Sequence, residues 1–281
     1  QNGLYTGASP PLPGTVDEFV HFALLQHPTP KRILLIGGGI LGGLAEVLKY
    51  DPEVVCYLEL DAAAFRMADD WAAPNDLRAL RDPRVRARQG DGRRFVKQGW
   101  RQELGESRFD AVLVCLPDPS TAQLNRFYTQ EWFQEVRGVL APGGILAWQV
   151  PGAEAYFSPA LLALDKCLYE TARAVFPSIV TMPGESAVLV GSVAEGDLTE
   201  DWMELEQRLR ARGIEAQYFE ALLPNTLDPG KLANVHETIA QAPPQPVNRD
   251  LRPIGFFLDQ AHWLTQFRPE SGPLLQRAQH I

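Results

Sequence analysis

Apolar and polar residues follow one another in blocks along this chain. Short runs, most of them rich in Val, Ile and Leu, end at glycine, proline or an acidic residue and predict buried parallel strands at 32–36, 54–60, 85–89, 111–116 and 145–150. The segments between them have the spacing of amphipathic helices, at 41–49, at 62–71, from residue 93 onward and at 129–140. This regular alternation predicts a doubly wound α/β sheet.

Both ends of the chain depart from this alternation. The first 30 residues are punctuated by proline and glycine around a single helical stretch at 16–25. After residue 150 we expect a helix at 159–175 and two strands, 178–182 and 187–191, that close the sheet as an antiparallel pair. Polar helices and an aromatic stretch follow. The predicted organisation is an N-terminal segment, a nucleoside-binding α/β domain and a helical C-terminal appendage, at 1–30, 31–195 and 196–281.

Composition is that of an ordinary globular protein and narrows the class of partner. The chain has 281 residues, of which 45% are hydrophobic, and a formal net charge of −9. An acidic balance argues against a nucleic-acid partner and suits either a cationic substrate or simply solubility. No signal peptide and no apolar run of about 18 residues is visible, so a cytoplasmic location is predicted. Because the chain begins with Gln1, we expect a processed product or a domain of a longer protein.

Cysteine and histidine usage predicts no metal site. Cys56, Cys115 and Cys167 lie in apolar surroundings without metal-ligand spacing, and the five histidines include no pair four residues apart. Cysteines in such positions are expected to be reduced thiols in a cytosolic setting.

The strongest chemical signal is the glycine run between the first strand and its helix. Gly37, Gly38 and Gly39 allow a tight turn and let a ligand approach the start of a helix. Glu59 ends the next strand, where a carboxylate accepts hydrogen bonds from both hydroxyls of a ribose. The alternative is a structural turn with a surface glutamate.

A third position helps to distinguish an adenosine ligand from a dinucleotide. Asp91 and Gly92 follow the third strand, and in methyltransferase-like sheets an Asp at this strand end takes the adenine amino group. A dinucleotide-binding fold has no specific need for it, so the combination favours adenosine, although a plain Gly-Asp-Gly turn is the alternative. The fold predicted is a Rossmann-like, methyltransferase-type sheet.

Several segments together resemble the spermidine and spermine synthases, the polyamine aminopropyltransferases. They are RILLIGGGILGGLAEVLK (32–49), YLELD (57–61), DPRVRARQGDGRRFV (82–96) and the run from FDAVLVCLPDP to PGGILAWQ (109–149). Asp17-Glu18-Phe19 stands where that family has its entry motif. The tail NRDLRPIGFFLDQAHW (248–263) resembles a bacterial subgroup in which this domain is fused to membrane-spanning segments. That likeness implies a membrane-domain partner, tethering at the inner face of a membrane and compatibility with a homo-oligomer.

The resemblance also implies roles for individual residues. Glu59 would hold the ribose hydroxyls, and Asp91 with the backbone at Gly92 would read adenine. The glycine loop would approach the sulfonium of S-adenosylmethionine or its decarboxylated form, a co-substrate that needs no metal. Asp118 would hold the amine of a small-molecule substrate.

Three positions depart from the family pattern at its chemical centre. The proton-accepting Asp is Cys115 here, the Asp inside the glycine loop is Ile40, and the Tyr after the Asp-Glu-Phe motif is His21. A thiol is a poor substitute for a carboxylate, whereas a histidine, with an ordinary pKa of about 6.5, could serve as a base. Both Cys115 and His21 are also typical structural residues. Slow or undetectable aminopropyl transfer is therefore expected.

Two other functions fit the same motifs. A nonenzymatic descendant would bind a nucleoside as a sensor or scaffold, and a methyltransferase would use the same co-substrate differently. An NAD-dependent oxidoreductase ranks lower, because no second catalytic domain is visible.

Some side chains are expected only to pack or to be solvated. Tyr128 and Trp132 have helical spacing and are predicted to be core residues. Arg93-Arg94 is expected at a solvated helix start. Phe256, Phe257 and Trp263 are expected to pack the last helix on the body, and a membrane or partner surface is the alternative.

Overall fold

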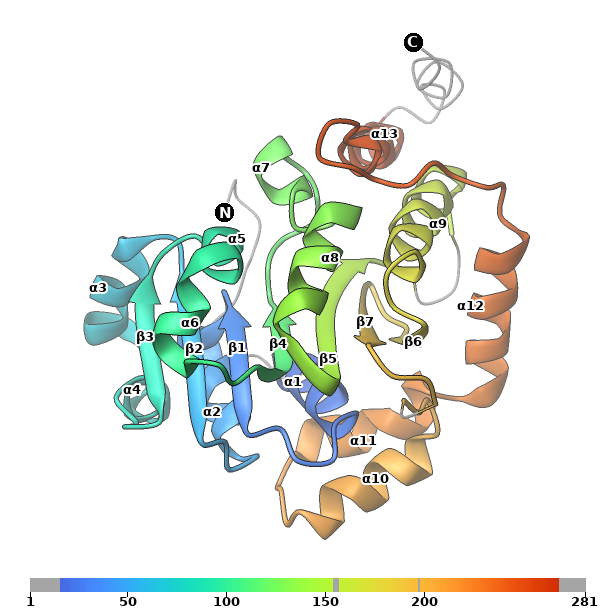
Figure 1. Ribbon diagram of the computed structural model, residues 1–281. Coiled ribbons are helices and arrows are strands. Elements are labelled where there is room, and N and C mark those ends of the chain that lie inside the picture. The colour runs from blue at the N-terminus through green and yellow to red at the C-terminus, as the bar shows by residue number, and fades with distance from the viewer. Residues whose placement is uncertain (1–15, 154–156, 197, 268–281) are drawn as a thin grey trace.

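A seven-stranded sheet forms the centre of the molecule (Figure 1). The structure is a computed structural model that describes residues 16–153, 157–196 and 198–267. The strands are β1 (Arg32–Ile36), β2 (Val54–Glu59), β3 (Val85–Gln89), β4 (Phe109–Val114), β5 (Leu140–Pro151), β6 (Ser178–Met182) and β7 (Ser186–Ser192). They lie in the order β3-β2-β1-β4-β5-β7-β6.

The sheet has the predicted parallel centre and antiparallel edge. β1 to β5 run parallel to their neighbours among themselves, whereas β7 is antiparallel to both β5 and β6. The chain moves outward from β1 to β3 and then returns to β4 on the other side of β1. The carboxyl ends of β1 and β4 therefore flank a topological switch point, where open α/β sheets bind their ligands.

Helices follow the strands along the chain. Their bounds are α1 (Val16–Leu25), α2 (Leu44–Leu48), α3 (Ala62–Trp71), α4 (Pro74–Leu80), α5 (Gly92–Arg94), α6 (Trp100–Leu104), α7 (Ala122–Asn125), α8 (Gln130–Val139), α9 (Pro159–Arg173), α10 (Trp202–Ala211), α11 (Gln217–Thr226), α12 (Pro229–Gln241) and α13 (Ile254–Phe267). Two π-helical turns, η1 (Gly39–Gly43) and η2 (Phe95–Gly99), precede α2 and α6. The predicted helix at 41–49 is therefore shorter, because the glycines occupy its first turn.

Each face of the sheet has its own apolar cluster, because successive residues of a strand point to opposite faces. On one face Leu34 and Trp148 pack with residues of α8 and α9. On the other face Leu35 and Leu113 pack with residues of α1, α2 and α11. The helix α1 thus shares the core of the sheet.

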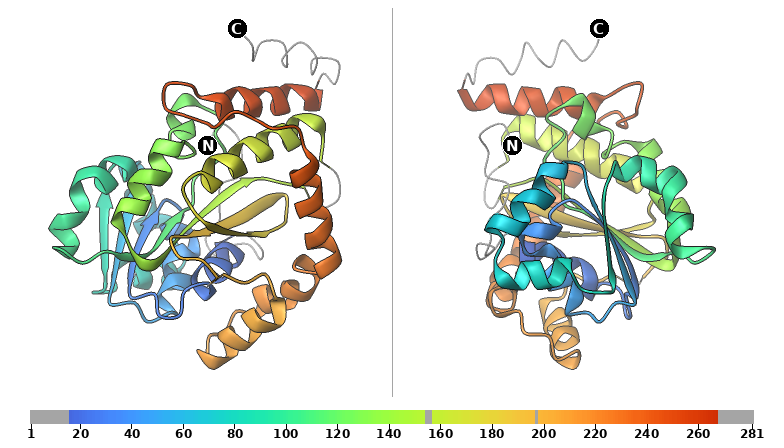
Figure 2. Two further views of the ribbon diagram at one scale, coloured as in Figure 1. Left: turned by 45° about the vertical axis from the view of Figure 1, so that its right-hand side comes forward. Right: turned by 90° about the vertical axis from the view of Figure 1, so that its left-hand side faces the viewer.

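The last four helices wrap around the domain. α10 and α11 pack near α1 at the bottom of Figure 1, α12 rises along one side, and α13 crosses the top against α9 (Figures 1 and 2). Leu258 and Ala261 of α13 are buried, but Phe257 and Trp263 are 56% and 54% exposed. The prediction that these two aromatic residues pack on the body is wrong, because they lie on the outer side of the helix.

A fully buried asparagine fixes the segment between α12 and α13. The Asn248 amide donates hydrogen bonds to the Tyr128 carbonyl (2.9 Å) and to Asn125 Oδ1 (3.0 Å), and its Oδ1 accepts from Gly255 N–H (3.0 Å). Its backbone N–H donates to Thr171 Oγ1, and its carbonyl accepts from the first N–H of α8. Every polar group of this residue is paired, so the tail docks in one position.

Candidate active site

The glycine loop leads from β1 into η1 and lies against the end of β4. Gly37 and Gly38 have φ values of 75° and 69°, a conformation that favours glycine. A Cβ atom on Gly38 would lie 2.5 Å from Cys115 Sγ, and one on Gly39 would lie 2.5 Å from the Tyr57 ring. The loop therefore requires glycine both for its backbone angles and for its close approach to two strands.

Glu59 and Asp91 stand at the carboxyl ends of neighbouring strands. β2 pairs with β3 through Glu59 and Gln89, and Gly90 N–H donates to the Glu59 carbonyl at 2.9 Å. The Glu59 carboxylate accepts a hydrogen bond of 3.0 Å from the Tyr57 hydroxyl. The structure thus brings both predicted nucleoside-binding carboxylates to the edge where the glycine loop lies.

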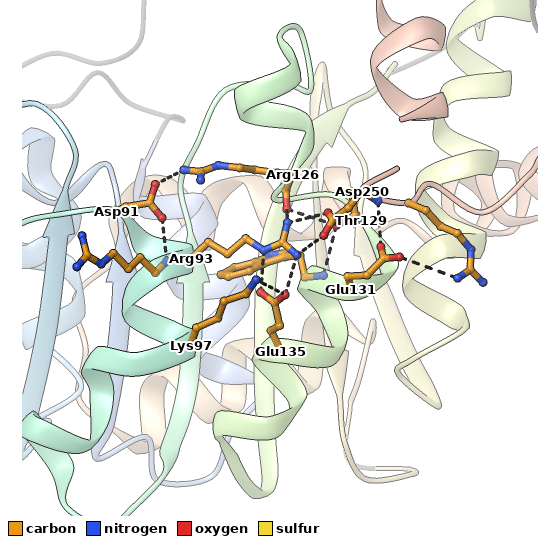
Figure 3. Close-up of polar contacts among 11 residues, drawn as sticks. Asp91, Arg93, Lys97, Arg126, Thr129, Glu131, Glu135 and Asp250 are labelled. Atoms are coloured by element: carbon orange, nitrogen blue, oxygen red, sulfur yellow. Dashed lines mark hydrogen bonds and ion pairs between the residues drawn. The ribbon is translucent and has the colours of Figure 1, made fainter. Parts of the chain in front are cut away.

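The Asp91 carboxylate is engaged within the protein. One oxygen caps α5 by accepting from Arg94 N–H at 2.8 Å, and the other pairs with the Arg126 guanidinium (Figure 3). Burial opposes ionisation of Asp91, but the hydrogen bonds from Arg126 and Arg94 outweigh it and lower the pKa. Gly92 packs so closely that a Cβ atom there would lie 2.7 Å from the Ile36 side chain. The sequence did not indicate a role for Arg126, because its partner Asp91 follows β3, whereas Arg126 lies between α7 and α8.

Arg93 is buried, which corrects the expectation of a solvated helix start. It is 5% exposed, and its guanidinium lies 2.7 Å from carboxylate oxygens of both Glu135 in α8 and Asp250 in the tail (Figure 3). Burial alone would lower its pKa, but the hydrogen bonds to the two carboxylates raise it. Arg93 therefore ties the tail to α5 and α8 by charge-assisted hydrogen bonds.

Cys115 follows β4 beneath the glycine loop. Its N–H donates to the Ile36 carbonyl at 2.9 Å, and its thiol lies 3.9 Å from Gln149 Oε1. Burial, together with the charge of Glu59, raises the pKa of the Cys115 thiol to about 11. The thiol is therefore protonated at neutral pH and cannot accept a proton from an amine.

Asp118 lies in the loop that continues from Cys115 to α7. The carboxyl group is partly buried, and burial raises its pKa. The Tyr128 hydroxyl holds this loop by donating to the Pro117 carbonyl at 3.0 Å. Tyr128 and Trp132 are 1% and 0% exposed, which confirms them as core residues.

His21 lies in α1, where its ring is fully buried. Its Nδ1 is 2.8 Å from the Tyr50 hydroxyl, and its Nε2 is 2.9 Å from the Glu46 carboxylate. The ring also contacts Phe219 of α11, with centroids 5.5 Å apart. None of these contacts joins His21 to Cys115, and both ring nitrogens have partners, so the structure favours the structural interpretation.

Two further buried carboxylates, on which the charge of Asp118 acts, were not assigned from the sequence. Asp165 of α9 and Asp259 of α13 are each 6% exposed. Burial raises the pKa of both, and the charge of Asp118 raises it further. For Asp259 the available signal was a single acid in the mainly apolar helix α13, which is costly to bury without a partner. The helix α9 gave no such signal, because it also contains Glu170 and two basic residues.

A protein-family comparison supports the sequence resemblance. The chain matches the spermine/spermidine synthase domain model over residues 15–200. The polyamine aminopropyltransferase 1 of Hyperthermus butylicus is 31% identical over 220 residues, which cover 75% of this chain and 73% of that protein. A polyamine aminopropyltransferase of Korarchaeum cryptofilum is 34% identical over 142 residues, but these cover only 48% of this chain and 42% of that protein.

Solved structures show the same fold. A spermidine synthase in complex with the transition state analogue AdoDATO has a TM-score of 0.61 at 21% identity, covering 79% of this chain and 75% of that one. Human methyltransferase-like protein 13, in complex with SAH, has a TM-score of 0.52 at 17% identity, covering 70% of this chain and 89% of that one. These confirm the Rossmann-like, methyltransferase-type sheet, and with the family match they show that the chain belongs to the spermine/spermidine synthase family.

Proposed function

We propose that this chain binds decarboxylated S-adenosylmethionine, or S-adenosylmethionine itself, and acts as a divergent aminopropyltransferase with an amine acceptor. The observation that carries the proposal is the meeting of Glu59, Asp91 and the glycine loop at one end of the sheet, beside Cys115 and Asp118. The names of the relatives, polyamine aminopropyltransferases, support the same reaction class.

The nucleoside half of the site has the groups that the proposal requires. Glu59, oriented by Tyr57, would accept hydrogen bonds from the ribose hydroxyls. Asp91 would accept from the adenine amino group, either beside Arg126 or in its place. The glycine loop carries no side chain at Gly38, so the sulfonium can approach the backbone next to Cys115.

The acceptor half of the site, which contains Cys115 and Asp118, must remove a proton from the attacking amine. In the proposed step the acceptor ammonium first loses a proton, which frees the lone pair of its nitrogen. The nitrogen then forms a bond to the aminopropyl carbon, the carbon–sulfur bond breaks, and methylthioadenosine leaves with the electron pair. The protonated Cys115 thiol cannot take the proton, and Asp118 alone would both hold an amine and accept the proton. Slow transfer follows.

Two measurements test the proposal. Titration calorimetry with decarboxylated and ordinary S-adenosylmethionine, methylthioadenosine and NAD should give binding of the adenosyl sulfur compounds and none of NAD. Methylthioadenosine release with putrescine or spermidine should be slow. Binding of NAD alone would contradict the proposal. Fast release would contradict the slow step and point to another base, and Glu18 would be replaced first, since burial beside Asp17 raises its pKa to about 7.

A nonenzymatic nucleoside sensor is the second candidate. It is favoured by the thiol at Cys115 and by the Arg126 side chain on Asp91, which a nucleoside would have to share or displace. Tight binding without methylthioadenosine release would select the sensor. Formation of S-adenosylhomocysteine from S-adenosylmethionine would instead indicate a methyltransferase.

The association with membranes stays a hypothesis that rests on the tail resemblance. Across the described ranges, each helix is either too short or too polar to cross a membrane. A membrane-domain partner and a homo-oligomer are likewise proposals, as is the absence of a metal from the reaction.

A further inference from the structure

The side chain of Arg126 reaches the carboxylate that is proposed to bind the base. Arg126 extends from the junction of α7 and α8 to Asp91, which follows β3 (Figure 3). Its guanidinium pairs with one oxygen of the Asp91 carboxylate. The other oxygen accepts from the Arg94 N–H at 2.8 Å and caps α5. The proposed partner of the adenine amino group is therefore already engaged by a side chain of this chain.

The backbone of Arg126 is fixed, whereas its guanidinium has contacts that do not depend on Asp91. The Arg126 carbonyl accepts a hydrogen bond of 2.9 Å from the buried Arg93 guanidinium. Along the side chain, Nε donates to the Gln123 carbonyl at 3.1 Å, and the guanidinium carbon lies 4.9 Å from the centre of the Phe127 ring. These contacts can hold the side chain after the guanidinium has left Asp91.

The ion pair itself is of a kind that a ligand can replace. The side chains of Arg126 and Asp91 are 35% and 24% exposed. The hydrogen bond from Arg126 lowers the pKa of Asp91 against the effect of burial, so the carboxylate is charged at neutral pH. Ion pairs that water reaches are weak, and salt weakens them further.

A carboxylate and a guanidinium present opposite groups to a purine. The ionised Asp91 carboxylate only accepts hydrogen bonds, so by itself it binds a 6-amino group and repels a 6-carbonyl. The Arg126 guanidinium only donates. It therefore competes with a 6-amino group for Asp91 and offers a partner to a 6-carbonyl.

We propose that Arg126 is a specificity-determining residue of the nucleoside site, which competes with a 6-amino purine for Asp91 and donates to a 6-oxo purine. The inference rests on the proposed function, in which Asp91 accepts from the base. It adds that this chain selects the 6-amino group less strictly than a site with a free carboxylate would. Purine nucleosides with a 6-carbonyl are then a second class of ligand for the site.

Two uncharged ligands and one variant test the inference by calorimetry. The ligands are methylthioadenosine and its deaminated analogue methylthioinosine, which has a carbonyl in place of the amino group. Arg126→Met should bind methylthioadenosine about threefold more tightly than the wild type, because the competitor is gone. It should bind methylthioinosine about tenfold more weakly, because a donor is lost.

The opposite signs separate a role in specificity from a merely structural one. Loss of structure would weaken binding of both ligands, so weaker binding of methylthioadenosine by Arg126→Met would overturn the inference. Arg66→Met, which removes an exposed cation from α3, is the matched control and should leave both affinities unchanged.

A salt series on the wild type needs no variant to fold. Since methylthioadenosine carries no charge, salt acts mainly on the ion pair that the ligand has to replace. Raising sodium chloride from about 0.05 to about 0.5 M should therefore strengthen its binding by about twofold. The same series should be much flatter in Arg126→Met. An affinity of the wild type that does not rise with salt would overturn the competition.

Failure of the proposed function would have a different signature. If neither nucleoside binds to the wild type or to Arg126→Met, the nucleoside site and the inference both fail. If both nucleosides bind with the same selectivity in the two proteins, only the role of Arg126 fails.

Discussion

At the ends of β2 and β3 Glu59 and Asp91 accept hydrogen bonds from protein donors, whereas Asp165 Oδ1 has no partner among the described residues and Asp259 accepts only a long bond of 3.4 Å from Gln260. Glu59 accepts from Tyr57, and Asp91 accepts from Arg126 and Arg94, so its pKa is lowered. Burial, and after it the charge of Asp118, raises the pKa of Asp165 and Asp259. Under the proposed function, the nucleoside half thus has its polar partners in place, whereas protons or a cation would stabilise the buried acids of the acceptor half.

Replacing Cys115 should have the largest effect of the variants considered, and the effect should be on the rate of methylthioadenosine release. Cys115→Asp restores a carboxylate next to the glycine loop and should raise methylthioadenosine release by about 10²–10⁴-fold, the usual contribution of general base catalysis. Buried Ile40 can limit the gain, because it offers nothing to the cationic end of the co-substrate. Cys115→Ser is the control and should stay slow. Equal rates for the Asp and Ser variants would show that the acceptor half is not limited by its base.

Breaking the Arg93 network should have the next largest effect, on stability. Arg93→Met leaves Glu135 and Asp250 without their shared cation, and should lower the free energy of unfolding by about 2–3 kcal/mol. Chemical denaturation measures it. Arg94→Met is the matched control, since Arg94 is exposed, and it should change stability little. Similar losses in both variants would mean that the tail is not held by Arg93.

Removing the carboxylate of Glu59, the proposed ribose-binding group, tests the nucleoside half directly. Glu59→Ala should weaken binding of methylthioadenosine by about 1–3 kcal/mol, because a charge-assisted hydrogen bond is lost. Calorimetry compares it with Asp70→Asn, which removes an exposed charge from α3. If the Asp70 variant binds as weakly as the Glu59 variant, the effect is only one of net charge.

Titration of Asp259 in the acceptor half should make the free energy of unfolding depend on pH. The pKa of Asp259 is raised from 3.8 to about 6 by burial and by Asp118, so the folded state binds more protons than the unfolded state between these values. The free energy of unfolding should therefore fall as pH rises from about 4 to 6. Asp259→Asn should reduce this fall and add about 1 kcal/mol above pH 7. A steeper fall in the variant would reverse the assignment.

The smallest effect concerns co-substrate selectivity. Ile40 is 8% exposed and lies in the apolar cluster of α1 and α2, so no carboxylate stands at that point of the loop. Decarboxylated and ordinary S-adenosylmethionine should bind within about threefold of one another, less than 1 kcal/mol. A strong measured preference for the decarboxylated form would show that another acid, Asp118 first, has taken this role.

Local patterns predicted most of the fold and the nucleoside half. Strand bounds follow from short apolar runs, and β6 has the predicted bounds of 178–182. The glycine loop and Glu59 can be recognised in the sequence because the loop is one contiguous segment and Glu59 directly ends a strand. Their placement in space is as expected, and their binding roles stay predictions.

Long-range partners could not be predicted. The carboxylate partners of Arg93 lie in α8 and in the tail, and the charge of Asp118 acts on Asp165 only after α9 packs on the sheet. The hydrophobic periodicity of a single sequence does not predict which distant helix will pack over a charged side chain. For the same reason Arg93 was expected in solvent and Phe257 on the body, although α8 and the tail cover Arg93 and Phe257 lies on the outer side of α13.

The buried position of Asn248 has a consequence for biosynthesis. Its hydrogen bonds satisfy groups on α8, on α9 and before α8, all of which leave the ribosome long before residue 248. Until the tail emerges, these groups lack their hydrogen bonds to Asn248. The nucleoside half, made from β1 to β3, leaves the ribosome well before the tail. The acceptor half is completed only when nearly the whole chain has been translated, so a chain shortened before Asn248 would keep the glycine loop but lack a finished second half.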